Sequence, residues 1–247
     1  MCAFCKTECT SSILNQISQS EKEQLEAFFA ELVVDAHFGY SLFGDKPVSL
    51  TGHFLLTPWN NVLELHKIDG DFWQKWKIWE KYQKQLEITH YLLVKEPASF
   101  KNSQFIILIN KKAFIHAFTK HAALFHAILG AGLKPEKILQ EIAEGKKTFF
   151  ESIRHNPTLL GLLLGYGEHN AICFSQKGKI LKMSCLRSFG DDSRFSLLRV
   201  GSLYFLADFK HPETQALYQK YEKLRGRLST IYAHGNFLPI TLSKLTE

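Results

Sequence analysis

The chain has 247 residues, of which 45% are apolar and 13% aromatic, so it has enough apolar surface to form a core and is not intrinsically disordered. Its net charge of +6 comes from 24 scattered lysines and only 6 arginines. Because bidentate contacts with phosphate or guanine favour arginine, nucleic acid is a disfavoured partner. No run approaches the roughly 20 apolar residues of a membrane span, so no transmembrane segment is predicted.

The N-terminus carries three of the five cysteines, Cys2, Cys5 and Cys9. Cys-x-x-Cys is the usual half of a zinc site, but no second half follows, so a reduced, metal-free tail is favoured over zinc and no other cofactor is predicted. Acylation of Cys2 is a further alternative. Since the start lacks the basic and apolar segments of a secretory signal, a cytoplasmic location is favoured over envelope association or export. Residues 1–17 are predicted as a flexible tail, and residues 18–247 as a single domain.

The first predicted helix begins at Ser18 or Ser20, which can cap it, and continues to about Asp35. The next segment, Gly39 to Leu50, contains two short β-prone runs separated by the turn residues 44–47. This pattern predicts a β-hairpin. A phosphate-binding loop is the alternative, but neither the glycine spacing nor a following Lys-Ser/Thr is present.

An aromatic stripe lies between residues 59 and 87, where Trp73, Trp76, Trp79 and Tyr82 recur every third residue with lysines between them. A step of three drifts around a helix with 3.6 residues per turn. The favoured interpretation is a core-facing surface with lysines in solvent. The alternative is an exposed surface that binds a protein partner or a membrane surface. Asp69-Gly70-Asp71 is expected to divide this segment into two helices.

Two adjacent strands, Tyr91–Val94 and Gln104–Ile109, are predicted to pair antiparallel. A helix is expected from Lys111 to Leu129 and another from Pro135 to about Glu144. The first of these carries three histidines at intervals of five. Because that interval does not place neighbours on one helical face, they are not predicted to bind metal; they are His116, His121 and His126.

A glycine corner follows the apolar run that ends at Leu164. Gly165 and Gly167 there predict the end of a helix and a sharp change of direction. Short strands are expected at Ala171–Phe174, Lys179–Leu186 and Val200–Ala207. A long helix is then predicted from Pro212 to about Gly235, followed by an extended C-terminal tail.

Common local signatures of serine hydrolases, zinc proteases and nucleotide-binding proteins are absent from the sequence. The remaining enzyme hypothesis is a cysteine-dependent hydrolase or transferase, in which a histidine activates Cys173 or Cys185. The histidine would be His169, His155 or His211, and an acid such as Asp191 would orient it. The apolar neighbours of Cys173 instead favour an inert thiol, so a non-enzymatic binding or interaction protein is the preferred interpretation.

Two motifs carry a resemblance to a known family. Residues 39–47 read GYSLFGDKP, and residues 155–170 fit the pattern HNPxLLGxLLGYGxxN. Together they resemble an uncharacterised protein family of bacteria that live inside eukaryotic cells. The family has no assigned activity, cofactor or catalytic residue, so the resemblance implies only a lifestyle-specific role, in the bacterial envelope or toward a host.

These observations predict an α+β fold in which helices cover a small, mostly antiparallel sheet. A binding site is expected at the aromatic stripe, or where the 39–47 segment meets the glycine corner. Packing alone is the alternative explanation for the glycines. The candidate binding residues are Trp73, Trp76, Trp79, Tyr82, Gly165, Gly167 and Asn170.

Overall fold

The main sheet is built around the central strand β4 (Ser103–Asn110). Strand β3 (Tyr91–Pro97) pairs antiparallel with one side of β4, with Tyr91 opposite Asn110 and Pro97 opposite Gln104. Strands β1 (Val48–Leu50) and β2 (Phe54–Leu55) follow each other along the other side, also antiparallel. A separate pair is formed by β5 (Ser184–Cys185) and β6 (Leu206–Ala207). The predicted α+β class with a small antiparallel sheet is confirmed.

This computed structural model describes residues 13–51, 54–55, 63–97, 103–176, 184–185, 203 and 205–247. The predictions for Cys2, Cys5, Cys9 and Asp191 lie outside these residues, as do parts of the strands predicted at 179–186 and 200–207. Within the described part, those two strands are present only as β5 and β6.

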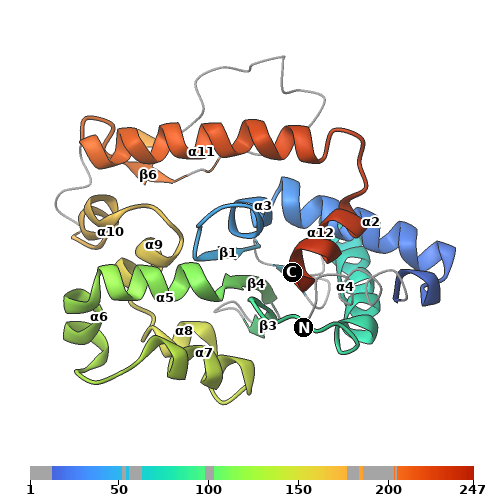
Figure 1. Ribbon diagram of the computed structural model, residues 1–247, viewed down its shortest axis with the longest axis horizontal. Coiled ribbons are helices and arrows are strands. Elements are labelled where there is room, and N and C mark those ends of the chain that lie inside the picture. Colours follow the sequence, from blue (N-terminus) through green and yellow to red (C-terminus); the bar gives the residue numbers. More distant parts are fainter. Residues whose placement is uncertain are drawn as a thin grey trace.

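Helices cover both faces of the main sheet. Alternate residues of β4 point to opposite faces, so each face has apolar side chains that must be buried. Ile106 and Leu108 belong to one core, whereas Phe105, Ile107 and Ile109 belong to another. The first core is formed with α2 (Gln19–Val34), α4 (Leu63–Gln83) and α12 (Phe237–Thr246). The second is formed with α5 (Lys111–Lys120), α6 (Ala122–Leu129), α7 (Pro135–Ala143), α8 (Phe149–Ser152) and α9 (Pro157–Leu163). The sheet therefore lies between two helical layers (Figure 1).

A third core lies where the long helix α11 (Pro212–Ile231) crosses α3 (Phe38–Leu42) (Figure 1). Tyr40 and Tyr221 make an edge-to-face contact in it, with ring centroids 5.7 Å apart. Buried aromatic pairs in this geometry stabilise a fold by more than the burial of their apolar area alone. This core holds α11 against the segment that carries the first motif.

Several local predictions are confirmed. Helix α2 begins after Ser18, whose side chain accepts a hydrogen bond from Glu21 N in a capping box. Strands β3 and β4 pair antiparallel, α7 begins at Pro135, and α11 begins at Pro212. Each of these elements has a strong signal within a few residues of its own start.

The hairpin predicted at Gly39–Leu50 is wrong. Residues 38–42 form α3, and the following strand β1 pairs with β4, about 60 positions further along the chain. The turn residues between them do change the chain direction, but the apolar side chains of α3 find their partners in α2 and α11. Turn chemistry identified the corner but not the strand's partner.

Two predicted helix boundaries are also wrong. Helix α4 continues through residues 69–71, where Lys75 pairs with Asp71 at 2.7 Å across one turn and supports the helical conformation. Conversely, the helix predicted at 111–129 is broken at His121, which separates α5 from α6.

The predicted strand at Ala171–Phe174 and the predicted C-terminal tail are both helical, and both predictions are wrong. These segments form α10 (Glu168–Ser175) and α12. Glu213 accepts hydrogen bonds from the first two backbone N–H groups of α10, at 3.0 and 2.9 Å. Glu26 does the same for α12, at 2.6 and 2.7 Å. Acids from distant helices therefore cap both N-termini, where the helix dipole favours negative charge.

Candidate functional site

The two sequence motifs lie next to each other, because the glycine corner approaches Lys46 of the first motif. Gly165, with φ of +78°, forms the corner after α9, and its carbonyl accepts a hydrogen bond from the Tyr221 hydroxyl at 2.8 Å. A Cβ placed on Gly165 would lie 3.5 Å from Lys46 Cγ, in the first motif. Gly167, with φ of +86°, precedes α10. Both glycines thus form the predicted corner. Side chains of α11 and of the first motif lie close to it.

Lys46 is buried at this junction with two serines. Its Nζ donates to Val48 O at 2.5 Å and to Ser49 Oγ at 3.1 Å, and the Ser41 and Ser49 hydroxyls lie 2.8 Å apart. Burial lowers the pKa of Lys46 to about 7. A lysine beside a serine can activate a nucleophile. Here Lys46 is 3% exposed, both serines are 0% exposed, and all three make hydrogen bonds inside the protein, so the group is structural.

Asn170, the other candidate at the corner, is saturated by hydrogen bonds inside the protein. Its amide nitrogen donates to Tyr166 O at 2.8 Å and to Thr214 Oγ1 at 3.0 Å. Its oxygen accepts from Asp208 N at 3.0 Å. With a 1% exposed side chain, Asn170 ties α10 to α11 and offers no polar atom to a ligand.

The aromatic stripe belongs to the core of the protein. Trp73, Trp76, Trp79 and Tyr82 are 8%, 2%, 1% and 4% exposed. Phe28 and Phe29 of α2 pack edge-to-face against Trp76 and Trp79, respectively. The core interpretation is therefore correct, and the described side chains of α4 form no exposed aromatic surface that could bind a partner or a membrane.

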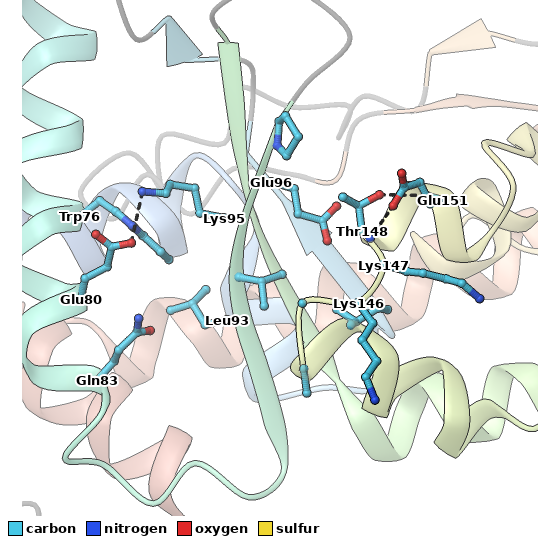
Figure 2. Close-up of a pocket in the computed structure, with 15 residues that line it drawn as sticks. Trp76, Glu80, Gln83, Leu93, Lys95, Glu96, Lys146, Lys147, Thr148 and Glu151 are labelled. Carbon is cyan, nitrogen blue, oxygen red and sulfur yellow. Dashed lines mark hydrogen bonds and ion pairs between the residues drawn. The ribbon is translucent and has the colours of Figure 1, made fainter.

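A groove opens along the outer edge of β3, with a cavity volume of about 430 Å³. Helix α4 forms one wall, and the α7–α8 connection with the start of α8 forms the other (Figure 2). Lys95 and Glu96, which are adjacent in β3, point toward opposite walls (Figure 2). The groove is lined by Trp76, Glu80, Gln83, Leu93, Val94, Lys95, Glu96, Pro97, Ile142, Ala143, Gly145, Lys146, Lys147, Thr148 and Glu151.

Glu96 is the most unusual residue of the groove, because it is an acid that is only 5% exposed. Phe149 N donates to its Oε1 at 2.5 Å, which anchors α8 to β3. Its Oε2 is buried and has no hydrogen-bond partner among the described residues. Burial raises the pKa of Glu96 against the opposing effect of the Phe149 and Phe150 backbone groups. One carboxyl oxygen of this groove residue is therefore buried without a hydrogen bond from the described part of the chain.

The other charged groups of the groove are engaged with neighbours. Lys95 pairs with Glu80 at 3.2 Å, and Lys147 pairs with Glu141 at 2.8 Å. Glu151 accepts a hydrogen bond from Thr148 N at 2.8 Å and completes the capping box of α8. Because these partners are internal, the distinctive electrostatic feature of the groove is Glu96.

Sequence reasoning identified Trp76 but missed Glu96. A signal for Glu96 exists in the β3 alternation, since Leu92, Val94 and Glu96 share one face and the first two pack against the second core. An acid in phase with apolar residues that pack against a core marks a position with a special environment. The walls of the groove come from α4 and α7–α8, whose approach to β3 cannot be read from local patterns.

The predicted Cys/His pair is also found in part. Cys173 Sγ lies 3.7 Å from His169 Nε2, and Asp208 Oδ2 lies 3.1 Å from that same nitrogen. The His211 ring stacks on His169 with centroids 3.7 Å apart. The hydrogen bond from His169 is the main cause that lowers the pKa of Asp208. In a catalytic triad the thiol and the acid engage different ring nitrogens, whereas here both engage Nε2.

No cluster of three or more His, Cys, Asp or Glu side chains placed to hold a metal ion occurs within the described residues. His121, one of the three regularly spaced histidines, instead lies 3.2 Å from the Glu168 carboxylate. In the same part of the chain, no helix combines the length and apolar character needed to cross a membrane.

The protein therefore has an α+β fold with a groove along the outer edge of its main sheet. No family model matches the chain, and no solved structure matches it. A segment is similar to a protein described as adenylosuccinate synthetase from Theileria annulata, with 30% identity over 123 residues. That alignment covers 45% of this chain and 25% of the relative, so the chain matches about a quarter of that protein's length.

Proposed function

We propose that this chain is a non-enzymatic binding protein whose ligand site is the groove between α4, β3 and the α7–α8 connection. The observation that carries this proposal is the buried Oε2 of Glu96, which has no partner among the described residues. A buried polar atom without a hydrogen bond costs about 1–3 kcal/mol, and in a native structure such an atom calls for an explanation, for example a bound ligand, ion or water. A ligand that donates to Oε2 would remove this cost.

The ligand group that fits Glu96 best is a basic side chain. A lysine or arginine side chain carries both a positive charge and N–H donors, and its long aliphatic stem can reach an oxygen below the surface. Leu93, Ile142 and Ala143 supply apolar contacts along the way. A small inorganic cation lacks such a stem, so a basic organic group is the expected class.

The biological setting of this binding follows from the two motifs and not from the groove. Their resemblance to proteins of intracellular bacteria supports a lifestyle-specific role, in the envelope or toward a host, with a protein as the partner. Cytoplasmic placement is the alternative. The groove is compatible with either setting, since it requires only a basic ligand group.

The binding proposal is tested by NMR titration of the protein with Nα-acetyl-lysine amide. We expect shifts of the backbone amides of Lys95, Glu96 and Gly145 and of the Trp76 indole N–H. Nα-acetyl-norleucine amide, which lacks the charge, is expected to bind at least about tenfold more weakly, because it cannot pair with Glu96.

Glu96→Gln is the decisive variant, because glutamine keeps an oxygen for Phe149 N and so preserves the anchor of α8. We expect it to abolish the preference for the lysine probe. Glu23→Gln, which removes the same charge at an exposed position of α2, is the matched control and should bind as the parent does. Absence of groove shifts with the lysine probe, or equal binding by the Glu96→Gln variant, would overturn the proposal.

A cysteine-dependent hydrolase or transferase is the second candidate, favoured by the contact of Cys173 with His169. Because His169 Nε2 already engages Asp208, we expect His169→Gln to change the alkylation rate of Cys173 by less than about threefold. The rate is measured by mass spectrometry of the Cys173 peptide after timed iodoacetamide treatment. A tenfold or larger decrease would show that the histidine activates the thiol and would favour the enzyme.

A further inference from the structure

The groove contains the outer edge of a β-strand. Within the described part of the chain, β3 pairs with β4 along one side and with no strand along the other. Residues Leu93 to Pro97 of β3 all line the groove. A strand edge presents backbone N–H and C=O groups that another extended chain can pair with, at a spacing of about 4.8 Å.

The two walls are arranged to receive alternating side chains. A strand laid beside β3 would direct its side chains alternately toward α4 and toward α7–α8, as Lys95 and Glu96 do (Figure 2). On the α4 side it would meet Glu80 and Gln83, and on the α7–α8 side it would meet Ile142 and Glu96. The groove therefore combines backbone pairing with a specific contact on each face.

Lys95, the exposed charged residue on this edge, is held away from the incoming chain. Charged side chains on edge strands commonly block strand addition. Here Lys95 Nζ lies 3.2 Å from Glu80 and 5.6 Å from the centre of the Trp76 ring, so its charge is held against α4. Pro97 lacks an N–H group and closes the ladder at the end of β3. The edge from Leu93 to Glu96 is thus left for pairing.

We propose that the groove binds an extended peptide segment, which adds as a strand to the outer edge of β3 and places a lysine or arginine side chain against Glu96. This inference rests on the proposed function and specifies its ligand class. Backbone pairing supplies affinity for extended peptides, and side-chain contacts supply the preference among them. The charge complementarity at Glu96 makes that preference basic.

The test uses the blocked heptapeptide acetyl-Thr-Val-Thr-Lys-Thr-Val-Thr-amide. We expect it to bind the full chain at least about tenfold more tightly than Nα-acetyl-lysine amide, because it adds backbone hydrogen bonds to the same lysine contact. Two N-methylated versions complete the design, one methylated at odd-numbered amides and one at even-numbered amides. Alternate amides of a strand face opposite edges, so one version blocks the edge that pairs with β3 and the other does not.

The expected result is that one N-methylated version loses at least about tenfold in affinity while the other binds nearly as the parent peptide does. Equal binding by both versions, or a heptapeptide no tighter than the lysine amide, would overturn strand addition. In that case groove shifts with the lysine amide would still support the proposed function. If neither probe shifts the groove amides, both proposals fail.

Discussion

Gly165→Ala is expected to destabilise the protein by about 3 kcal/mol or more, the combined cost of a left-handed backbone and a broken buried hydrogen bond. Gly165 has φ of +78°, a conformation that an L-residue adopts at a cost. A Cβ there would also lie 2.3 Å from the Tyr221 hydroxyl oxygen. Because that hydroxyl donates to Gly165 O at 2.8 Å, moving it away would break the bond. Chemical denaturation of the variant measures the loss.

Gly132→Ala is the matched control for the backbone effect. Gly132 has φ of +87°, but a Cβ there would meet no atom within 4 Å. We expect this variant to lose only about 1 kcal/mol. In a Tyr221→Phe background, where the clashing oxygen is absent, the cost of Gly165→Ala should fall toward that value. An unchanged cost in that background would show that the contact with Tyr221 does not dominate.

Lys46→Met is expected to remove a rise in stability with increasing pH. Because burial lowers the folded pKa of Lys46 to about 7 from an ordinary 10.5, the unfolded chain binds more protons between these values. Stability therefore rises with pH across that window, by up to about 1.4 kcal/mol per pH unit from this one group. The variant keeps an unbranched side chain of similar length but cannot titrate. Its free energy of unfolding should therefore change less with pH than that of the parent.

The measurement is urea denaturation of both proteins at several pH values from 7 to 9.5. This range stops short of the region in which the buried tyrosines act in the opposite direction, because burial raises the pKa of groups such as Tyr166. Lys84→Met, at an exposed position of the chain, is the matched control and should retain the rise. If Lys46→Met retains it as well, Lys46 is not the group responsible.

The sequence predicts best those elements whose ends are determined locally. Ser18 caps α2 three residues from its partner, and the short continuous apolar runs of β3 and β4 mark two adjacent strands that pair. Helices α10 and α12 differ, because acids from distant segments, Glu213 and Glu26, accept hydrogen bonds from their first backbone N–H groups. No short window of sequence contains both partners, so α10 and α12 were predicted as a strand and a tail.

The candidate site shows the same division between local and distant information. The sequence predicts the glycine corner itself, but Asn170 and Lys46 beside it have hydrogen-bond partners inside the protein. Of the aromatic stripe, only Trp76 lines the groove. Glu96 acquires its role from the approach of α7–α8 to the edge of β3, which depends on packing across the second core. Tertiary apposition, not residue pattern, creates this groove.

The most direct measurement of the central claim is a carbon-13 NMR titration of the Glu96 carboxyl group, with and without Nα-acetyl-lysine amide. Because burial raises the pKa of this group, we predict a midpoint above the ordinary value of 4.5 in the free protein. The bound cation should lower that midpoint, because it favours the ionised carboxylate. A midpoint at or below 4.5 that the probe leaves unchanged would contradict the assignment of Glu96 as the ligand-binding acid of the groove.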